Sequence, residues 1–93
     1  MTSIREIAKG LRFPEGPIAM LDGSFLVVEI ERATISRIDA KGNVSVIASP
    51  GGGPNGLAIG PDGAFYLCNN GGGLYKQGHS MSLGPHPDYK HGW

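Results

Sequence analysis

The chain has a single cysteine, no excess of charge and no long apolar run. Because Cys68 is its one cysteine, an internal disulfide framework is excluded. Eight basic residues balance eight acidic ones, so nothing indicates a nucleic-acid partner or an anionic membrane surface. No segment approaches the roughly 20 apolar residues of a membrane-spanning helix, and the N-terminus lacks the apolar core of a signal peptide. We therefore expect a cytoplasmic protein with neither nucleic acid nor membrane as a partner.

Glycine and proline, in contrast, are abundant. The 93 residues include 16 glycines and 7 prolines, most of them between short apolar runs. This pattern favours many short strands joined by turns over helices. Residues 25–30 are nearly continuously apolar, as expected for a strand covered on both faces. Residues 34–38 alternate between apolar and polar, which predicts a half-exposed strand.

Two stretches of the chain match each other one repeat apart. Residues 14–27 align with residues 54–67, and Pro, Gly, an Asp-Gly turn and Phe recur at the same places. Residues 4–8 align in the same way with residues 44–48. A period of about 40 residues, built from short strands and Asp-Gly turns, is typical of a β-propeller blade. We expect an all-β chain whose blades are four-stranded antiparallel meanders.

The segments predict how much of a propeller the chain holds. We interpret residues 4–8 as an orphan outer strand, residues 14–48 as a first blade, residues 54–76 as an incomplete second blade and residues 77–93 as a polar tail. A closed propeller needs roughly four to eight blades, and this chain has about two. We therefore expect one partial propeller region, the opening third of a larger protein.

One position of the repeat carries candidate functional side chains. Glu15 precedes the first inner strand, and Asn55 takes the same place in the second repeat. Equivalent positions of successive blades meet around one end of a propeller's central channel. A carboxylate and an amide oxygen there suit a hard divalent cation such as Ca²⁺. The alternative is that both are ordinary turn residues, since Pro-Asn-Gly is a common turn sequence.

Two motifs resemble a known family. Residues 13–17, Phe-Pro-Glu-Gly-Pro, followed by residues 22–30, resemble the opening of the senescence marker protein, gluconolactonase and luciferin-regenerating enzyme family. Residues 53–72 resemble the second blade of its bacterial members. The resemblance implies a six-bladed propeller with one divalent metal ion in its central channel. Members of this family hydrolyse lactones, including sugar lactones, or related esters.

The resemblance also implies roles for individual residues. Glu15 matches a metal ligand of the family, and Asn55 matches an asparagine that contacts the substrate or the metal site. Asn70 is a further substrate-binding candidate, although Asn69 and Asn70 also fit an ordinary Asn-Asn-Gly-Gly turn. The implied cofactor is calcium, with zinc, magnesium or manganese as alternatives. The family's other metal ligands belong to later blades and have no counterpart here, and no catalytic residue is identified.

Two classes of function therefore stay open. The first is the N-terminal part of a metal-dependent hydrolase that acts on sugar lactones or similar small esters. The second is a non-catalytic propeller fragment or interaction module that self-associates through unpaired blade edges. Three copies of two blades make a six-bladed ring, so a homotrimer could surround one axis with three copies of Glu15 and Asn55. Cys68 lies in an apolar run, so we expect a buried and unreactive thiol.

Overall fold

The computed structural model describes residues 3–71, and this part of the chain is built from β-strands. No helix occurs in these residues, so they include no helix that could cross a membrane. The expectation of an all-β chain is confirmed for them. Residues 72–76 of the expected second blade and the tail at 77–93 lie outside the described residues. The strands are β1 (Pro14–Ala19), β2 (Phe25–Glu29), β3 (Thr34–Ile38), β4 (Val44–Ala48), β5 (Pro54–Ile59) and β6 (Phe65–Asn69).

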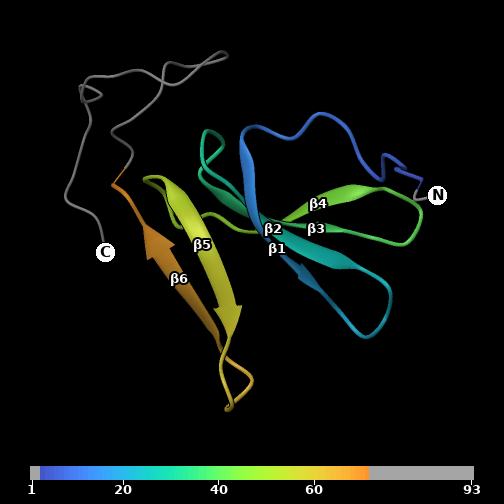
Figure 1. Ribbon diagram of the computed structural model, residues 1–93. Coiled ribbons are helices and arrows are strands. Elements are labelled where there is room, and N and C mark those ends of the chain that lie inside the picture. The colour runs from blue at the N-terminus through green and yellow to red at the C-terminus, as the bar shows by residue number, and fades with distance from the viewer. Residues whose placement is uncertain (1–2, 72–93) are drawn as a thin grey trace.

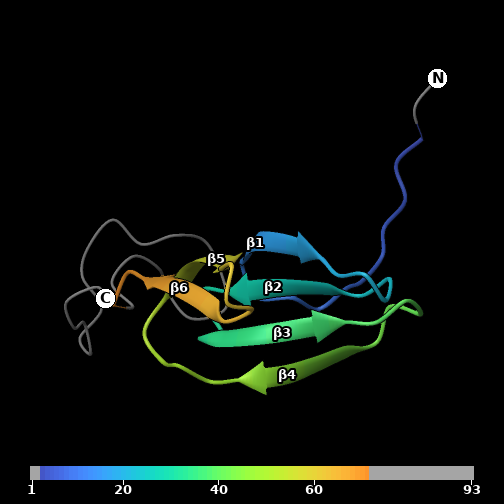
Figure 2. The same ribbon diagram turned by 90° about the horizontal axis from the view of Figure 1, so that it is seen from below.

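These strands form two antiparallel sheets. The first has four strands in the order β1-β2-β3-β4, and the second is the hairpin β5-β6 (Figures 1 and 2). Because each strand pairs with its neighbour in sequence, every connection within a sheet is a short turn. Antiparallel meanders of the expected kind are therefore present, and the propeller itself stays a prediction.

Residues 4–8, the expected outer strand, do not form a strand in this structure. They lead away from the sheets toward the N-terminus (Figure 1), and Ile4 is 98% exposed. A strand exists only when its backbone N–H and C=O groups pair with a neighbour. None of the described strands pairs with this segment. Ile7 O lies instead against Gly42, in the turn between β3 and β4.

The sequence period reappears in the backbone. β5 begins and ends 40 residues after β1, and β6 begins and ends 40 residues after β2. The two connecting turns also correspond. Gly23 N donates to Met20 O over 3.1 Å, and Gly63 N donates to Gly60 O over 2.9 Å. Gly23 and Gly63 have φ angles of 88° and 81°, in the left-handed region that glycine adopts without steric cost. The Asp-Gly motif therefore builds the same turn twice.

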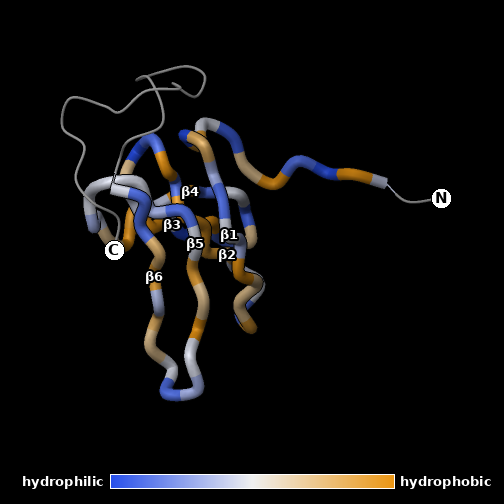
Figure 3. The backbone as a smooth tube through the Cα atoms, turned by 60° about the vertical axis from the view of Figure 1, so that its left-hand side comes forward, coloured by the Kyte–Doolittle hydropathy of each residue, from blue (hydrophilic) through white to orange (hydrophobic). Residues whose placement is uncertain are grey.

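The apolar core lies in the middle of the four-stranded sheet. β2 is buried along almost its whole length, as its apolar run predicts. β3 is buried as well, so the prediction of a half-exposed strand at residues 34–38 is wrong. The edge strand β4 is exposed throughout, and apolar residues also occupy the exposed hairpin β5-β6 (Figure 3). The buried apolar side chains are Leu26, Val27, Val28, Ile30, Ile35 and Ile38.

Truncation of a core leucine tests this arrangement. Leu26 is 3% exposed, whereas Leu21, in the turn after β1, is fully exposed. We expect Leu26→Ala to lower the free energy of unfolding by about 2–5 kcal/mol, because it removes buried methyl groups and leaves a cavity. Leu21→Ala is the matched control and should change it by less than about 0.5 kcal/mol. Urea unfolding followed by circular dichroism measures both, and equal effects of the two substitutions contradict the assigned core.

Candidate functional site

The first strands of the two repeats approach each other closely at Gly16. A Cβ atom added there would lie 3.2 Å from the backbone N of Leu57 and 3.5 Å from the Cα of Gly56. Gly16 also has a φ of 56°, which disfavours any side chain. β1 and β5 therefore lie side by side (Figure 1), in contact next to residues 15 and 55.

Glu15 and Asn55 both occupy exposed positions near the starts of these strands. Glu15 is opposite Val28 in the β1-β2 ladder, and the register shifts directly after it. Asn55 lies at the register shift between Pro54 and Gly56 in the β5-β6 ladder. Bulges of this kind redirect side chains and are common beside functional sites. The structure thus brings the two strand starts together, and the roles of the two side chains stay predictions.

Asn70 lies against the segment that enters β5. Its backbone N donates to Gly53 O over 2.8 Å. A Cβ atom added at Gly53 would collide with the Asn70 side chain, whose Oδ1 would be 2.0 Å away. Asn70 therefore packs on the backbone two residues before Asn55. This contact joins residues that are distant in sequence, and the substrate-binding role of Asn70 stays a prediction.

Glu15 and Asn55 have the right type of oxygen atom for a cation, but they are too few to complete its coordination. The oxygens of Glu15 and Asn55 are of the type that Ca²⁺ prefers, but Ca²⁺ takes about six to eight oxygen ligands. Within residues 3–71, no group of three or more His, Cys, Asp or Glu side chains could hold a metal ion. The metal site at Glu15 and Asn55 thus stays a prediction, and we derive no catalytic step from these residues.

The sequence interpretation missed Glu29, a fully buried carboxylate at the end of β2. Its Oε1 accepts hydrogen bonds from Arg12 N over 2.7 Å and from Arg32 Nε over 2.8 Å. Its Oε2 accepts hydrogen bonds from the hydroxyl groups of Thr34, over 3.2 Å, and Ser36. A buried charge is tolerated only when it is paired and hydrogen-bonded in this way. The one sign of this carboxylate in the sequence was an acidic residue within an otherwise apolar strand.

Burial and hydrogen bonding act on Glu29 in opposite directions. Burial raises its pKa, because desolvation disfavours the charged form. Hydrogen bonds from Ser36, Arg32 and the Arg12 N–H outweigh burial, so the pKa of Glu29 lies below its ordinary value of 4.5. Glu29 is therefore a carboxylate at neutral pH.

Asn69 takes the corresponding position at the end of β6, 40 residues after Glu29. Its Oδ1 accepts hydrogen bonds from Gly53 N and Gly71 N, each over 2.9 Å. Its Nδ2 donates to Gly51 O over 2.7 Å. Asn69 is buried and holds the loop before β5 to the end of β6. Asn69 is thus the last residue of β6, and no turn is assigned at residues 70 and 71.

The prediction of a buried thiol at Cys68 is wrong. Cys68 is exposed on β6. Among the described strands, β6 pairs with β5 alone, so the apolar run that contains Cys68 is not covered as a central strand would be.

The buried carboxylate predicts a pH dependence of stability. Because the pKa of Glu29 is lowered by folding, its charge contributes stability fully above about pH 4.5 and loses it as the pH falls through the lower folded value. We therefore expect the free energy of unfolding of Glu29→Gln to fall less steeply than that of the wild type as the pH drops below 4.5. The hydrogen bond from the Ser24 side chain lowers the pKa of Asp22 to about 2, so both proteins share a further decline at lower pH. Urea unfolding across acidic pH values measures the slopes, and identical slopes contradict this role.

Comparison with family models and with curated proteins found no relative of this chain. No protein-family model matches it, and no curated protein matches it either. The resemblance to the gluconolactonase family therefore stays a prediction that depends on the motifs around Glu15 and Asn55 alone.

Proposed function

We propose that this chain supplies the first blades of a β-propeller hydrolase of the lactonase type, in which Glu15 is one ligand of a divalent cation. The observation that carries the proposal is the contact between β1 and β5 at Gly16. The two strands have equivalent bounds and equivalent following turns. Inner strands of successive propeller blades surround a central channel in the same way. Their starts are where the sequence motifs place the oxygen donors.

The chemistry of these residues suits an ester substrate. Glu15 would hold the cation through its exposed carboxylate. When bound, a divalent cation supplies a Lewis acid that polarises a carbonyl group. Asn55 has an amide that can accept and donate hydrogen bonds, so it would ligate the cation or orient the ring oxygens of a sugar lactone. Asn70, against the segment before Asn55, is the proposed second contact to the substrate.

The other ligands must come from outside residues 3–71. Further blades would supply them in the family that the motifs resemble, and other copies of the chain would supply them in a homotrimeric ring. Ring closure by three copies would repeat the Glu15 and Asn55 donors around one axis. Both arrangements keep the same role for Glu15.

A second candidate is a non-catalytic interaction module, favoured by the edge strand β4. All five of its residues are exposed, including Val44, Val46 and Ile47. Among the described strands, β4 pairs with β3 alone. An apolar edge with free backbone groups can pair with another chain.

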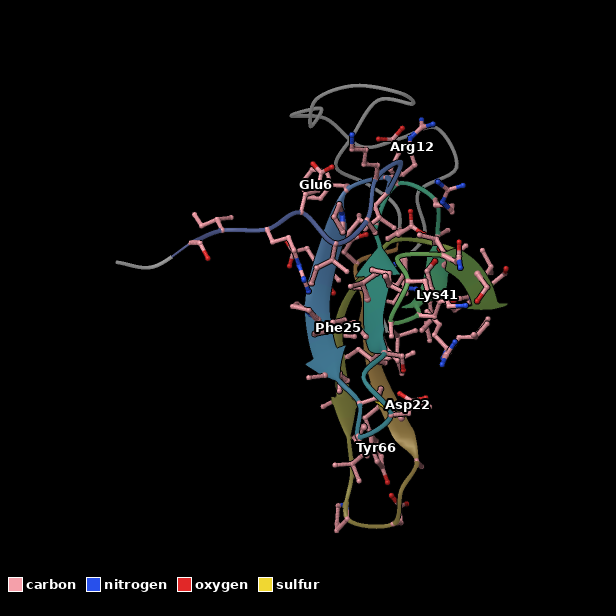
Figure 4. All side chains as sticks on the ribbon, turned by 90° about the vertical axis from the view of Figure 1, so that its right-hand side faces the viewer. Glu6, Arg12, Asp22, Phe25, Lys41 and Tyr66 are labelled. Atoms are coloured by element: carbon pink, nitrogen blue, oxygen red, sulfur yellow. The ribbon has the colours of Figure 1, made fainter. Side chains whose placement is uncertain are left out.

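Calcium binding by a charge-neutral variant tests the role of Glu15. In titration calorimetry with CaCl₂, we expect Glu15→Gln to weaken binding about tenfold or more, because affinity for Ca²⁺ depends on the number of charged ligands. Glu6→Gln is the matched control, since Glu6 is an exposed glutamate on the N-terminal segment (Figure 4). It should leave binding unchanged. Light scattering on the same samples gives the oligomeric state in which binding occurs.

Hydrolysis of glucono-δ-lactone by the same samples completes the test. Activity that requires Ca²⁺ and is lost in Glu15→Gln supports the hydrolase. A wild-type chain that neither binds Ca²⁺ nor hydrolyses the lactone in any oligomeric state contradicts a hydrolase formed by copies of this chain. In that case, self-association seen by light scattering would favour the interaction module.

A further inference from the structure

Equivalent side chains in the two repeats hold the backbone that leads into β1 and β5. Glu29 accepts a hydrogen bond from Arg12 N over 2.7 Å, three residues before Glu15. Asn69 accepts one from Gly53 N over 2.9 Å, two residues before Asn55. Both acceptors are buried, and each ends the second strand of its repeat.

The segment held by Glu29 contains an unfavourable backbone conformation. Phe13 has a φ of 58°, in the left-handed region that a non-glycine residue seldom occupies. Such a conformation persists only when its surroundings hold it. The hydrogen bond from Arg12 N to Glu29 lies on one side of Phe13, and Phe13 O accepts a hydrogen bond from Ile30 N over 3.0 Å. The approach to β1 is thus fixed directly before Glu15.

Arg32 adds hydrogen bonds that hold the chain further toward the N-terminus. Its Nε donates to the Glu29 carboxylate, and its NH2 group donates to Gly10 O over 2.8 Å. The carboxylate and the guanidinium therefore hold residues 10–13 together. Each carboxylate oxygen of Glu29 accepts two hydrogen bonds, so both oxygens are already engaged.

In the second repeat, different residues hold the segment before β5. Gly51 and Gly52 have φ angles of 81° and 63°, which glycine accepts without strain. Asn69 bridges this loop, since it donates to Gly51 O and accepts from Gly53 N. An uncharged amide therefore replaces the carboxylate at the equivalent position.

We propose that Glu29 and Asn69 are positioning residues, which fix the locations of Glu15 and Asn55 at the starts of β1 and β5. Their hydrogen bonds go to backbone and side-chain groups of the protein. Each acts through the backbone segment that it holds, and the contact between Gly16 and Leu57 depends on both segments. The consequence for metal binding rests on the function proposed above, whereas the structural consequence does not.

Nuclear magnetic resonance of the full chain tests the structural part without metal. In Glu29→Ala, we expect exchange protection of the Arg12 amide to fall about tenfold or more. The nuclear Overhauser contact between the Gly16 α-protons and the Leu57 amide proton should be lost as well. Glu29→Gln keeps an acceptor for the Arg12 N–H, so it should retain both signals.

Asp22→Ala is the matched control for a general loss of stability. Asp22 accepts hydrogen bonds from Ser24 N over 2.9 Å and from Arg37 over 3.1 Å. Arg12 and Asp22 lie at opposite ends of the β1-β2 hairpin (Figure 4). The control should therefore destabilise the hairpin and still preserve the contact between Gly16 and Leu57. Loss of that contact in Asp22→Ala, or its retention in Glu29→Ala, overturns the proposal.

Asn69→Ala provides an independent variant if Glu29→Ala does not fold. It removes an amide and leaves the buried carboxylate network intact. We expect protection of the Gly53 amide and the contact between Gly16 and Leu57 to disappear, while the amides of β2 and β3 keep their protection. Unchanged protection of Gly53 together with an unchanged contact overturns the role of Asn69.

Calcium titration of the same variants tests whether the positioning role of Glu29 affects the proposed metal site. We expect Glu29→Ala to weaken Ca²⁺ binding about tenfold or more, and Glu29→Gln and Asp22→Ala to bind like the wild type. Equal weakening in Glu29→Ala and Asp22→Ala overturns a positioning role at the metal site. If the wild type binds no Ca²⁺, copies of this chain alone do not form the proposed site, and the resonance measurements still decide whether Glu29 and Asn69 hold the strand starts.

Discussion

The structure depends on one buried charge, the carboxylate of Glu29. It joins three parts of the chain: the approach to β1, the end of β2 and the buried face of β3. A carboxylate in this position is costly to bury, and it is stabilised only while its partners stay in place. Loss of any of its four hydrogen bonds therefore leaves the buried charge less well compensated. This requirement fixes the backbone around Phe13 in a conformation that it would otherwise avoid.

The two repeats have the same backbone arrangement, but different side chains stabilise it. β1-β2 and β5-β6 have the same bounds one period apart and the same turn hydrogen bonds. The first repeat uses a charged network and a strained phenylalanine, whereas the second uses Asn69 and flexible glycines. The second hairpin also buries fewer of its side chains. The shared plan brings Glu15 and Asn55 to neighbouring strands, and we propose that a cation and a lactone bind there.

Local signals in the sequence predicted the strands of both hairpins and their turns, but they also predicted a strand at residues 4–8 that does not form. Asp-Gly turns and short apolar runs act over a few residues, so the period identifies both hairpins without further information. The buried state of β3 was not predictable in this way. Its alternation indicated an exposed face, but Thr34 and Ser36 point their hydroxyl groups at Glu29. Such a partnership between strands leaves no trace in periodicity, and an acidic residue in an apolar strand was its only local sign.

The central claim is that the two repeats place residues 15 and 55 side by side. Pyrene excimer fluorescence measures this most directly, on a chain with Glu15→Cys, Asn55→Cys and Cys68→Ser, labelled at both new thiols. The account predicts a strong excimer band that does not depend on protein concentration. The control pair Glu15→Cys and Val44→Cys, on strands at opposite edges of the four-stranded sheet, should give monomer emission. Monomer emission from the first pair, with the strands still folded by circular dichroism, would contradict the account.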